Sequence, residues 1–157
     1  MLKIGHAFPA FNLQDQTGQP HSLADYAGQW VVIYFYPKDN TSACTLEAQD
    51  FTAQVQKFKA LRTPVIGVSP DSVKTHANFV TKKELGIILL SDPTHQLLEA
   101  AGVWQKKKLY GKEYMGVVRT TAIVDPQGTV RELWSQVKVP GHVEKVLAQL
   151  TELQSTT

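Results

Sequence analysis

The sequence predicts an α/β fold with a mixed, mainly parallel central sheet, helices on both faces of the sheet and an N-terminal β-hairpin. Three observations favour this class. Short apolar segments alternate with amphipathic ones over residues 30–101, as parallel strands alternate with connecting helices. Two strand-like segments near the C-terminus flank the turn at residues 125–128, which adds an antiparallel edge. The 157 residues, 43% of them apolar, suffice for one domain with a buried core.

The individual elements follow from local patterns. Strands are expected where short runs are rich in apolar, β-branched and aromatic residues, and helices where apolar residues recur every three or four positions. The predicted strands are residues 11–13, 19–22, 30–36, 64–68, 87–90, 117–124 and 129–134. The predicted helices are residues 41–61, 69–85, 95–101 and 141–150, with a short helical turn at 22–25. Residues 110–116 are expected to form a surface loop.

The segment at residues 30–36 is continuously apolar, which is typical of a strand covered on both faces. Pro37 ends it because proline has no N–H to donate to a neighbouring strand. The order of hairpin, strands and helices is a thioredoxin-like outline with extra elements, and we expect a single domain of this kind over residues 1–157. Since many activities share this outline, the function has to be inferred from particular residues.

Composition and charge exclude several classes of protein. The net charge of +2 is too small for a nucleic-acid-binding domain, and the only basic run, residues 106–108, is short. The single cysteine, Cys44, excludes an intramolecular disulfide and a multi-cysteine zinc site. The five histidines are dispersed and no glycine-rich phosphate loop is present, so we expect no metal and no cofactor.

No feature of the sequence suggests export or a membrane. The N-terminal residues lack the apolar core of a signal peptide, and no apolar run approaches the roughly 20 residues that span a bilayer. We therefore expect a soluble cytoplasmic protein whose thiol is kept reduced.

Cys44 lies in the segment that joins the predicted strand at residues 30–36 to the following helix. Open α/β sheets bind ligands at the carboxyl ends of their strands. The unpaired N–H groups and partial positive charge of a helix N-terminus favour a thiolate, the nucleophilic form of cysteine. This position indicates a reactive cysteine, and the alternative is a small buried hydrophobic residue, as most cysteines are.

Arg119 lies within a predicted core strand, residues 117–124, in which it is the only charged residue. Arginine is almost never fully buried unless it is paired, and an unpaired buried charge costs several kcal/mol. A buried Arg119 therefore needs an anion, and the candidates are the Cys44 thiolate and Glu47, one turn into the helix. The alternative is an arginine on an edge strand that points to water.

Two further residues flank Cys44. Thr41, three residues before it, is a good N-cap for the helix, and its hydroxyl can also bond the sulfur or a substrate oxygen. These two roles are compatible. Pro37 is expected to end the strand and, in addition, to keep water off the sulfur.

At these residues the sequence resembles the peroxiredoxins, in particular the bacterioferritin comigratory protein or Q type, over nearly the whole chain. The central matches are residues 35–41 (FYPKDNT) and 44–51 (CTLEAQDF). Further matches are residues 67–69, 71–72, 76, 79, 90–92, 102–104, 119–121 and 125–128. The spacing Pro-x-x-x-Thr-x-x-Cys together with a distant strand arginine is specific to the superfamily.

The resemblance implies a role for each matching residue. Cys44 would be the peroxidatic cysteine, whose thiolate attacks a peroxide oxygen. Thr41 and Arg119 would bond the two oxygens in the transition state, and Arg119 would also favour the thiolate. Pro37 would shield the sulfenic acid from over-oxidation, and Glu47 would hold Arg119 in place. The implied substrates are hydrogen peroxide and organic hydroperoxides.

The chain departs from the family pattern in two places. Ser42-Ala43 stand where relatives commonly have Pro-Gly, which puts the backbone of this loop in question. No resolving cysteine exists, because Gln49 occupies one usual position and Cys44 is the only cysteine. The implied cycle uses one cysteine, and an external thiol of the thioredoxin, glutaredoxin or glutathione type would reduce its sulfenic acid. Relatives of this type include monomers, so we expect a monomer or a weak homodimer.

Two other functions are weighed against the peroxidase. A thioredoxin-fold redox sensor or binding module would pass oxidation from Cys44 to partners through a mixed disulfide, which the absence of a resolving cysteine would prolong. A thiol–disulfide reductase is disfavoured, because Thr41 stands where a Cys-x-x-Cys motif needs its first sulfur.

Overall fold

The computed structural model describes residues 1–156. Its strands are β1 (Asn12–Asp15), β2 (Pro20–Ser22), β3 (Val31–Phe35), β4 (Val65–Ser69), β5 (Ile88–Ser91), β6 (Trp104–Leu109), β7 (Lys112–Val117), β8 (Thr120–Val124) and β9 (Val130–Trp134). Its helices are the 3-10 helix η1 (Leu23–Tyr26) and the α-helices α1 (Ser42–Ala53), α2 (Val55–Ala60), α3 (Val73–Lys83), α4 (Gln96–Ala100) and α5 (His142–Ser155). Each predicted strand and helix overlaps an observed one.

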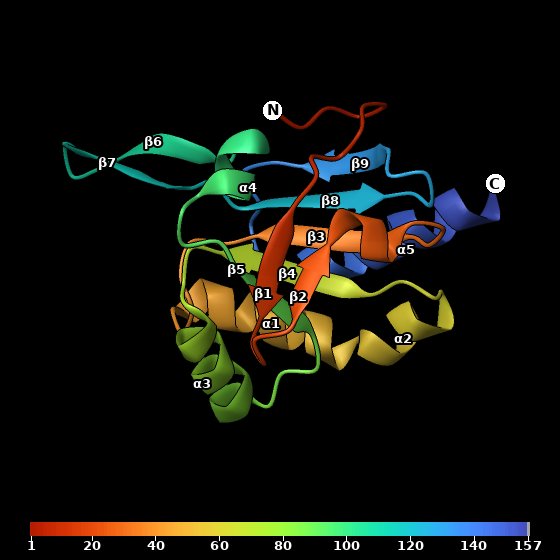
Figure 1. The fold of residues 1–157 in the computed structure, drawn as a ribbon, viewed down its shortest axis with the longest axis horizontal. Helices are drawn as coiled ribbons and strands as arrows, with labels where there is room; N and C mark the ends of the chain where they lie inside the picture. The colour runs from red at the N-terminus through yellow and green to blue at the C-terminus, as the bar shows by residue number, and fades with distance from the viewer. Residues whose placement is uncertain (157) are drawn as a thin grey trace.

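Seven of these strands form one mixed sheet in the order β2-β1-β5-β4-β3-β8-β9 (Figure 1). The central strands β3, β4 and β5 pair in parallel, and the pairings of β1 with β2 and β5, and of β8 with β3 and β9, are antiparallel. The predicted fold class, with its mixed sheet and N-terminal hairpin, is confirmed. The parallel pairings are confined to the three central strands.

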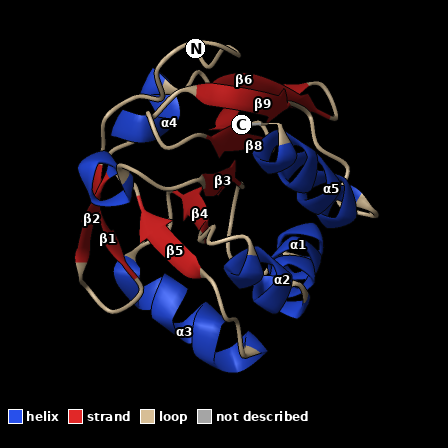
Figure 2. Ribbon diagram, turned by 90° about the vertical axis from the view of Figure 1, so that its right-hand side faces the viewer, coloured by secondary structure: helices blue, strands red, loops and turns tan. Residues whose placement is uncertain are grey.

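Helices cover both faces of the sheet (Figure 2). Side chains from α1, α2, α3 and α5 pack with one face in an apolar cluster that includes Tyr34, Phe51 and Phe58. Side chains from α4, η1 and the N-terminal segment pack with the other face around Ile33 and Phe35. Adjacent residues of β3 thus belong to opposite clusters, and all five are buried, as predicted for a strand covered on both sides.

The segment expected to be a surface loop, residues 110–116, is instead part of a second sheet. Strands β6 and β7 pair antiparallel from Trp104↔Val117 to Leu109↔Lys112 and form a hairpin that projects from the body of the molecule (Figure 1). The turn consists of Tyr110 and Gly111, both at positive φ, which is the backbone that a tight two-residue hairpin turn requires. Strand β6 could not be predicted from its lysine-rich sequence, because its side chains are largely exposed and show no apolar alternation.

Three predicted boundaries are corrected. The helix expected at residues 41–61 is broken at Gln54 into α1 and α2. The strand expected at residues 117–124 is interrupted at Val118 and Arg119, where the chain passes from β7 into the main sheet. There the Val118 N–H donates to the Val103 carbonyl, and the Arg119 carbonyl accepts from the Val137 N–H. Helix α5 continues past residue 150 to Ser155, and its last turn is tied to the end of α2 by a bond from Gln154 Nε2 to the Leu61 carbonyl.

Candidate active site

Cys44 is the third residue of α1, in the first turn after the loop that follows β3. Its side chain is 2% exposed, and it packs in the cluster that α1 forms with the sheet. Ser42 and Ala43, the residues that depart from the usual Pro-Gly, are the first two residues of the helix. A helical position does not require glycine, so alanine at position 43 is compatible with the loop.

Arg119 reaches Cys44 through the pairing of β3 with β8. The register places Thr120 opposite Phe35, so Arg119 emerges beside the carboxyl end of β3, where the loop to α1 begins. Its Nη2 atom donates to Cys44 Sγ at 3.2 Å, and its Nη1 atom donates to Glu47 Oε1 at 2.7 Å. Both partners considered from the sequence, Cys44 and Glu47, are thus contacted by the two arms of one guanidinium, and the Arg119 side chain is 13% exposed. Arg119 lies just before β8 and not within a strand, which corrects the predicted placement.

Two opposing effects set the pKa values in this cluster: burial disfavours the charged form of each group, and the neighbouring opposite charge favours it. Burial raises the pKa of Glu47 to about 7, although the Arg119 guanidinium favours the carboxylate. Burial lowers the pKa of Arg119, but the charges of Glu47 and Cys44 outweigh it and raise that pKa overall. The Glu47 side chain is fully buried, and its Oε2 atom has no hydrogen-bond partner among the described residues. Glu47 therefore sits where its charge depends on the guanidinium beside it.

Thr41 and Pro37 belong to the loop that joins β3 to α1. Thr41 is the N-cap residue of α1, but its side chain makes no capping hydrogen bond, which corrects that part of the prediction. Its hydroxyl donates instead to the Lys38 carbonyl at 3.1 Å, and the residue is exposed. Pro37 is half-buried and lines a pocket together with Arg119.

Two surface pockets meet at Arg119. The first, here called the basic pocket, has a volume of about 430 Å³ and is lined by Pro37, Gln105, Lys106, Lys107, Val118, Arg119, Gln136 and Val137. The second, here called the apolar groove, has a volume of about 520 Å³ and is lined by Ser42, Ala43, Leu46, Arg119, Val137, Lys138, Val139 and Pro140. A small molecule can thus reach the guanidinium from a charged side and from an apolar side.

Sequence reasoning missed Lys107 as a residue of this site. Its ammonium donates to the Val117 carbonyl at 2.8 Å, at the base of the β6–β7 hairpin. Burial and the Arg119 charge lower the pKa of Lys107, while the charge of Cys44 opposes that shift. The only sequence signal was the basic run at residues 106–108, which a solvated loop would explain equally well.

A buried polar network, also missed, holds the loop before α1. Asp39 accepts a bond from the Tyr36 hydroxyl at 2.6 Å, lies 2.6 Å from Nδ1 of His76, and donates its backbone N–H to Asp71 at 2.9 Å. Nε2 of His76 lies 2.9 Å from the Leu90 carbonyl. Asp39, Asp71 and His76 could offer three ligand atoms to a metal, but these side chains are already hydrogen-bonded within the protein, which favours a structural role.

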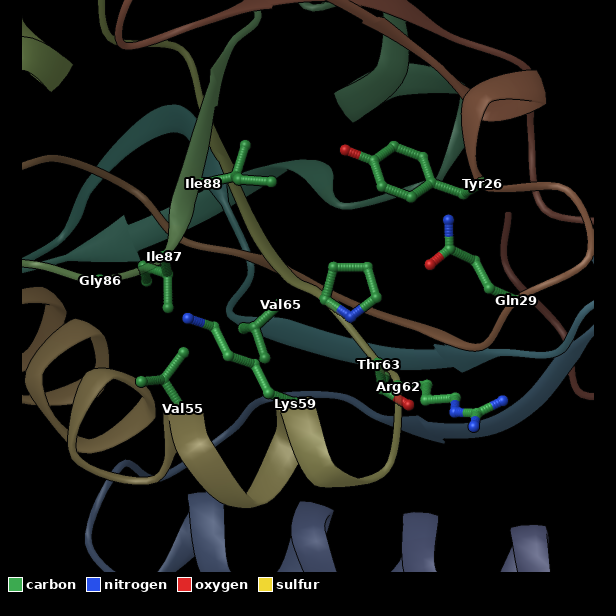
Figure 3. A pocket seen from close by; sticks show the side chains of 11 residues that line it. Tyr26, Gln29, Val55, Lys59, Arg62, Thr63, Val65, Gly86, Ile87 and Ile88 are labelled. Atoms are coloured by element: carbon green, nitrogen blue, oxygen red, sulfur yellow. The ribbon is translucent and has the colours of Figure 1, made fainter.

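A third pocket lies away from the cysteine. It has a volume of about 530 Å³ and opens at the amino ends of β4 and β5, beside Pro64 and Ile87, whereas Cys44 follows the carboxyl end of β3. Apolar side chains such as Val55 and Ile88 line it together with the side chain of Lys59 (Figure 3). None of the predicted site residues lines this pocket.

A thioredoxin-type sheet that presents one buried cysteine, at a helix N-terminus and against an arginine, defines a thiol-dependent oxidoreductase. The family model described as the AhpC/TSA family matches residues 4–133. The chain is 43% identical over 152 residues to peroxiredoxin Bcp of Bacillus subtilis, covering 97% of each chain. It therefore belongs to the AhpC/TSA family, and within it to the peroxiredoxins of the Bcp or Q type, which are thiol-dependent peroxidases.

Solved structures agree with this assignment. The bacterioferritin comigratory protein of Xanthomonas campestris, studied for its alkyl peroxide reduction activity, aligns with a TM-score of 0.88 at 39% identity over 97% of each chain. A cysteine-to-serine variant of PrxQ from Xylella fastidiosa aligns with a TM-score of 0.93 at 35% identity over 98% of each chain. No helix among residues 1–156 is both long enough and apolar enough to cross a membrane.

Proposed function

We propose that Cys44 is the peroxidatic cysteine of this thiol peroxidase and that a single domain, residues 1–157, carries a one-cysteine cycle. The observation that supports this most directly is the 3.2 Å contact between Arg119 Nη2 and Cys44 Sγ at the N-terminus of α1. The guanidinium and the helix N-terminus both stabilise a negative sulfur, which is the form that attacks peroxides. The single cysteine means that no second thiol of the chain can resolve the product.

In the first step, the Cys44 thiolate attacks one peroxide oxygen. The S–O bond forms with the sulfur electron pair, the O–O bond breaks, and the leaving oxygen takes a proton and departs as water or an alcohol. Arg119 donates to the oxygens as charge develops on them. Thr41 supplies a second donor once its hydroxyl turns from the Lys38 carbonyl to the peroxide. Pro37 shields the sulfenic acid, and Glu47 holds the guanidinium through the 2.7 Å bond.

The substrates are hydrogen peroxide and organic hydroperoxides. The apolar groove supports the second class, because its aliphatic residues Leu46, Val139 and Pro140 lead to Arg119. The alkyl part of a hydroperoxide would lie along these residues while its O–O group meets the guanidinium. The X. campestris relative, studied for alkyl peroxide reduction, supports the same substrate class.

An external thiol completes the cycle. The reductant is of the thioredoxin, glutaredoxin or glutathione type, since the sulfenic acid needs a sulfur from outside the chain. The protein works as a monomer or a weak homodimer in the cytoplasm, where such thiols are kept reduced.

Replacing Arg119 tests this proposal. Arg119→Ala is expected to slow the oxidation of Cys44 by hydrogen peroxide by roughly a hundred- to a thousandfold, because a donor aimed at the developing charge is lost. Arg119→Lys keeps the charge but not the two-armed contact, so its oxidation rate should lie between those of the unaltered protein and Arg119→Ala. The measurement is stopped-flow detection of sulfenic acid formation under pseudo-first-order peroxide.

Arg131→Ala is the matched control, because Arg131 lies on β9 and pairs with Asp125 at 3.5 Å, away from Cys44. It should oxidise at the unaltered rate. A wild-type thiol that reacts no faster than free cysteine would refute the role of Cys44, and an unchanged rate in Arg119→Ala would refute that of Arg119.

A further inference from the structure

The basic pocket carries an unbalanced charge. Lys106, Lys107 and Arg119 line it, and none of its lining residues is acidic. The Lys106 ammonium lies 3.3 Å from Glu113, but both side chains are more than half exposed, so this pair is largely screened. Lys107 is held in place by its bond to the Val117 carbonyl. The pocket therefore presents fixed positive charge beside the reacting sulfur.

Oxidation of Cys44 increases the uncompensated positive charge of this pocket. Before the reaction, the thiolate and Glu47 both face the Arg119 guanidinium. Attack on a peroxide converts the thiolate into a neutral sulfenic acid, and the negative charge leaves with the departing oxygen. The guanidinium then loses the negative sulfur as a partner, so the same pocket attracts anions more strongly after the first step than before it.

We propose that the basic pocket binds small thiols that carry carboxylate groups and that it selects them as reductants of the oxidised enzyme. This inference rests on the proposed role of Cys44 and names the chemical class of the second substrate. The carboxylates would lie against Lys106 and Lys107, at the hairpin end of the pocket. The thiol would point to Arg119, which both lines the pocket and contacts Sγ of Cys44.

Two successive thiolate attacks reduce the sulfenic acid. The thiolate of the bound reductant attacks the Cys44 sulfur, the S–S bond forms, and the S–O bond breaks. The hydroxide that leaves takes up a proton and departs as water. A second thiolate then attacks the mixed disulfide, which releases the Cys44 thiolate and the oxidised reductant. Glutathione, a thiol with two carboxylates and one amino group, belongs to the proposed class.

A series of small thiols that differ in charge tests the proposal. The enzyme is first oxidised with one equivalent of hydrogen peroxide, and the gain of one oxygen atom is verified by mass spectrometry. It is then mixed with cysteamine, 2-mercaptoethanol, 3-mercaptopropionate or mercaptosuccinate. Rate constants are compared per thiolate, which removes the different ionised fractions, and each is divided by the rate constant of the same thiolate with a small uncharged disulfide, which removes the different intrinsic nucleophilicities. We expect the rate to rise along this series, by about tenfold from the neutral thiol to the dianionic one at low salt.

Substitutions locate the effect. Lys107→Gln should reduce the ratio of the mercaptosuccinate rate to the 2-mercaptoethanol rate severalfold. The ratio cancels any change in the intrinsic reactivity of the Cys44 sulfur, so a merely structural effect would leave it unchanged. Lys108→Gln is the matched control, because it removes the same charge from the same strand at an exposed residue that does not line the pocket. Its ratio should equal that of the unaltered protein.

The outcomes separate the two proposals. An enzyme that gains no oxygen from one equivalent of peroxide would overturn the role of Cys44 and this inference together. Normal oxidation followed by equal rates for all four thiols, or by a preference for cysteamine, would overturn the inference alone. An equal loss of the ratio in Lys107→Gln and Lys108→Gln would also overturn it, since the preference would then come from the overall charge of the hairpin.

Discussion

Glu47 carries a charge that depends strongly on its surroundings. It is fully buried one turn after Cys44 and bonds to one arm of Arg119 while the other arm contacts the sulfur. Because burial raises the pKa of Glu47 to about 7, its charge changes near neutral pH. Ionised Glu47 strengthens the bond that orients Arg119, yet it also competes with the thiolate for the same guanidinium.

Glu47→Gln separates these effects. The amide oxygen keeps an acceptor for Arg119 without the charge, and charge-assisted hydrogen bonds are about twice as strong as neutral ones. We expect oxidation of Cys44 to slow by about tenfold. The pH profile of this rate should also lose an inflection near pH 7 that the unaltered protein shows. An inflection that persists in Glu47→Gln would assign it to another group.

At the scale of elements, the junction of β3 and α1 depends on the buried pair Asp39 and His76. Nε2 of His76 faces the Leu90 carbonyl, which can only accept, so Nε2 carries a hydrogen. One further proton then lies between His76 Nδ1 and the Asp39 carboxylate, 2.6 Å apart. This network ties the loop that carries Thr41 to α3 and β5.

The proton count predicts which substitutions the pair tolerates. Asp39→Asn supplies an N–H to a neutral His76 and still accepts from the Tyr36 hydroxyl, so it should cost less than about 1 kcal/mol of unfolding free energy. His76→Leu leaves a buried carboxylate without its partner and should cost about 3–5 kcal/mol. Urea denaturation at pH 7 measures both. Equal losses in the two variants would contradict the shared proton.

At the scale of the whole molecule, α5 closes one face of the sheet through His142. This residue begins the helix, is buried, and lies with Nε2 2.8 Å from the Thr121 hydroxyl of β8. Burial, with smaller contributions from Lys145 and Arg119, lowers the pKa of His142 to about 4. The positive end of the helix dipole acts in the same direction.

This shift predicts how stability depends on pH. An unfolded histidine takes up a proton near pH 6.5, whereas the folded one resists protonation down to about pH 4. The unfolded state therefore binds more protons in this window, and the folded state loses stability as the pH falls from 6.5 to 4. We expect a loss of about 2 kcal/mol, less than the full shift implies, because the Thr121 hydroxyl can rotate to accept a hydrogen bond from the protonated ring.

Urea denaturation between pH 4 and pH 7 measures this loss, with His142→Gln as the comparison. Glutamine does not titrate, so the variant should show a smaller decrease in unfolding free energy over the same window. Identical pH dependence in both proteins would mean that other groups, such as the carboxylates, account for the acid sensitivity.

Several features could be predicted from the sequence because they depend on neighbouring residues. The apolar run at residues 30–36 had to be a buried strand, and the position of Cys44 after it had to be the start of a helix. The need of Arg119 for an anion followed from the cost of burying a charge. Other features had no local signal. The exposed β6–β7 hairpin lacks apolar alternation, and the partners Asp39 and His76 are 37 residues apart.

Local patterns in the chain were enough to predict a covered sheet, a lone cysteine at a helix N-terminus and the lack of a second cysteine to resolve it. That Arg119 contacts Cys44 and Glu47 at the same time, and that Lys107 lines the same pocket as Arg119, became apparent only from the folded chain. Spacing along the chain fixes which face a side chain occupies, but strand register fixes which distant side chains meet. The register of β3 against β8 brings together two residues that are 75 positions apart.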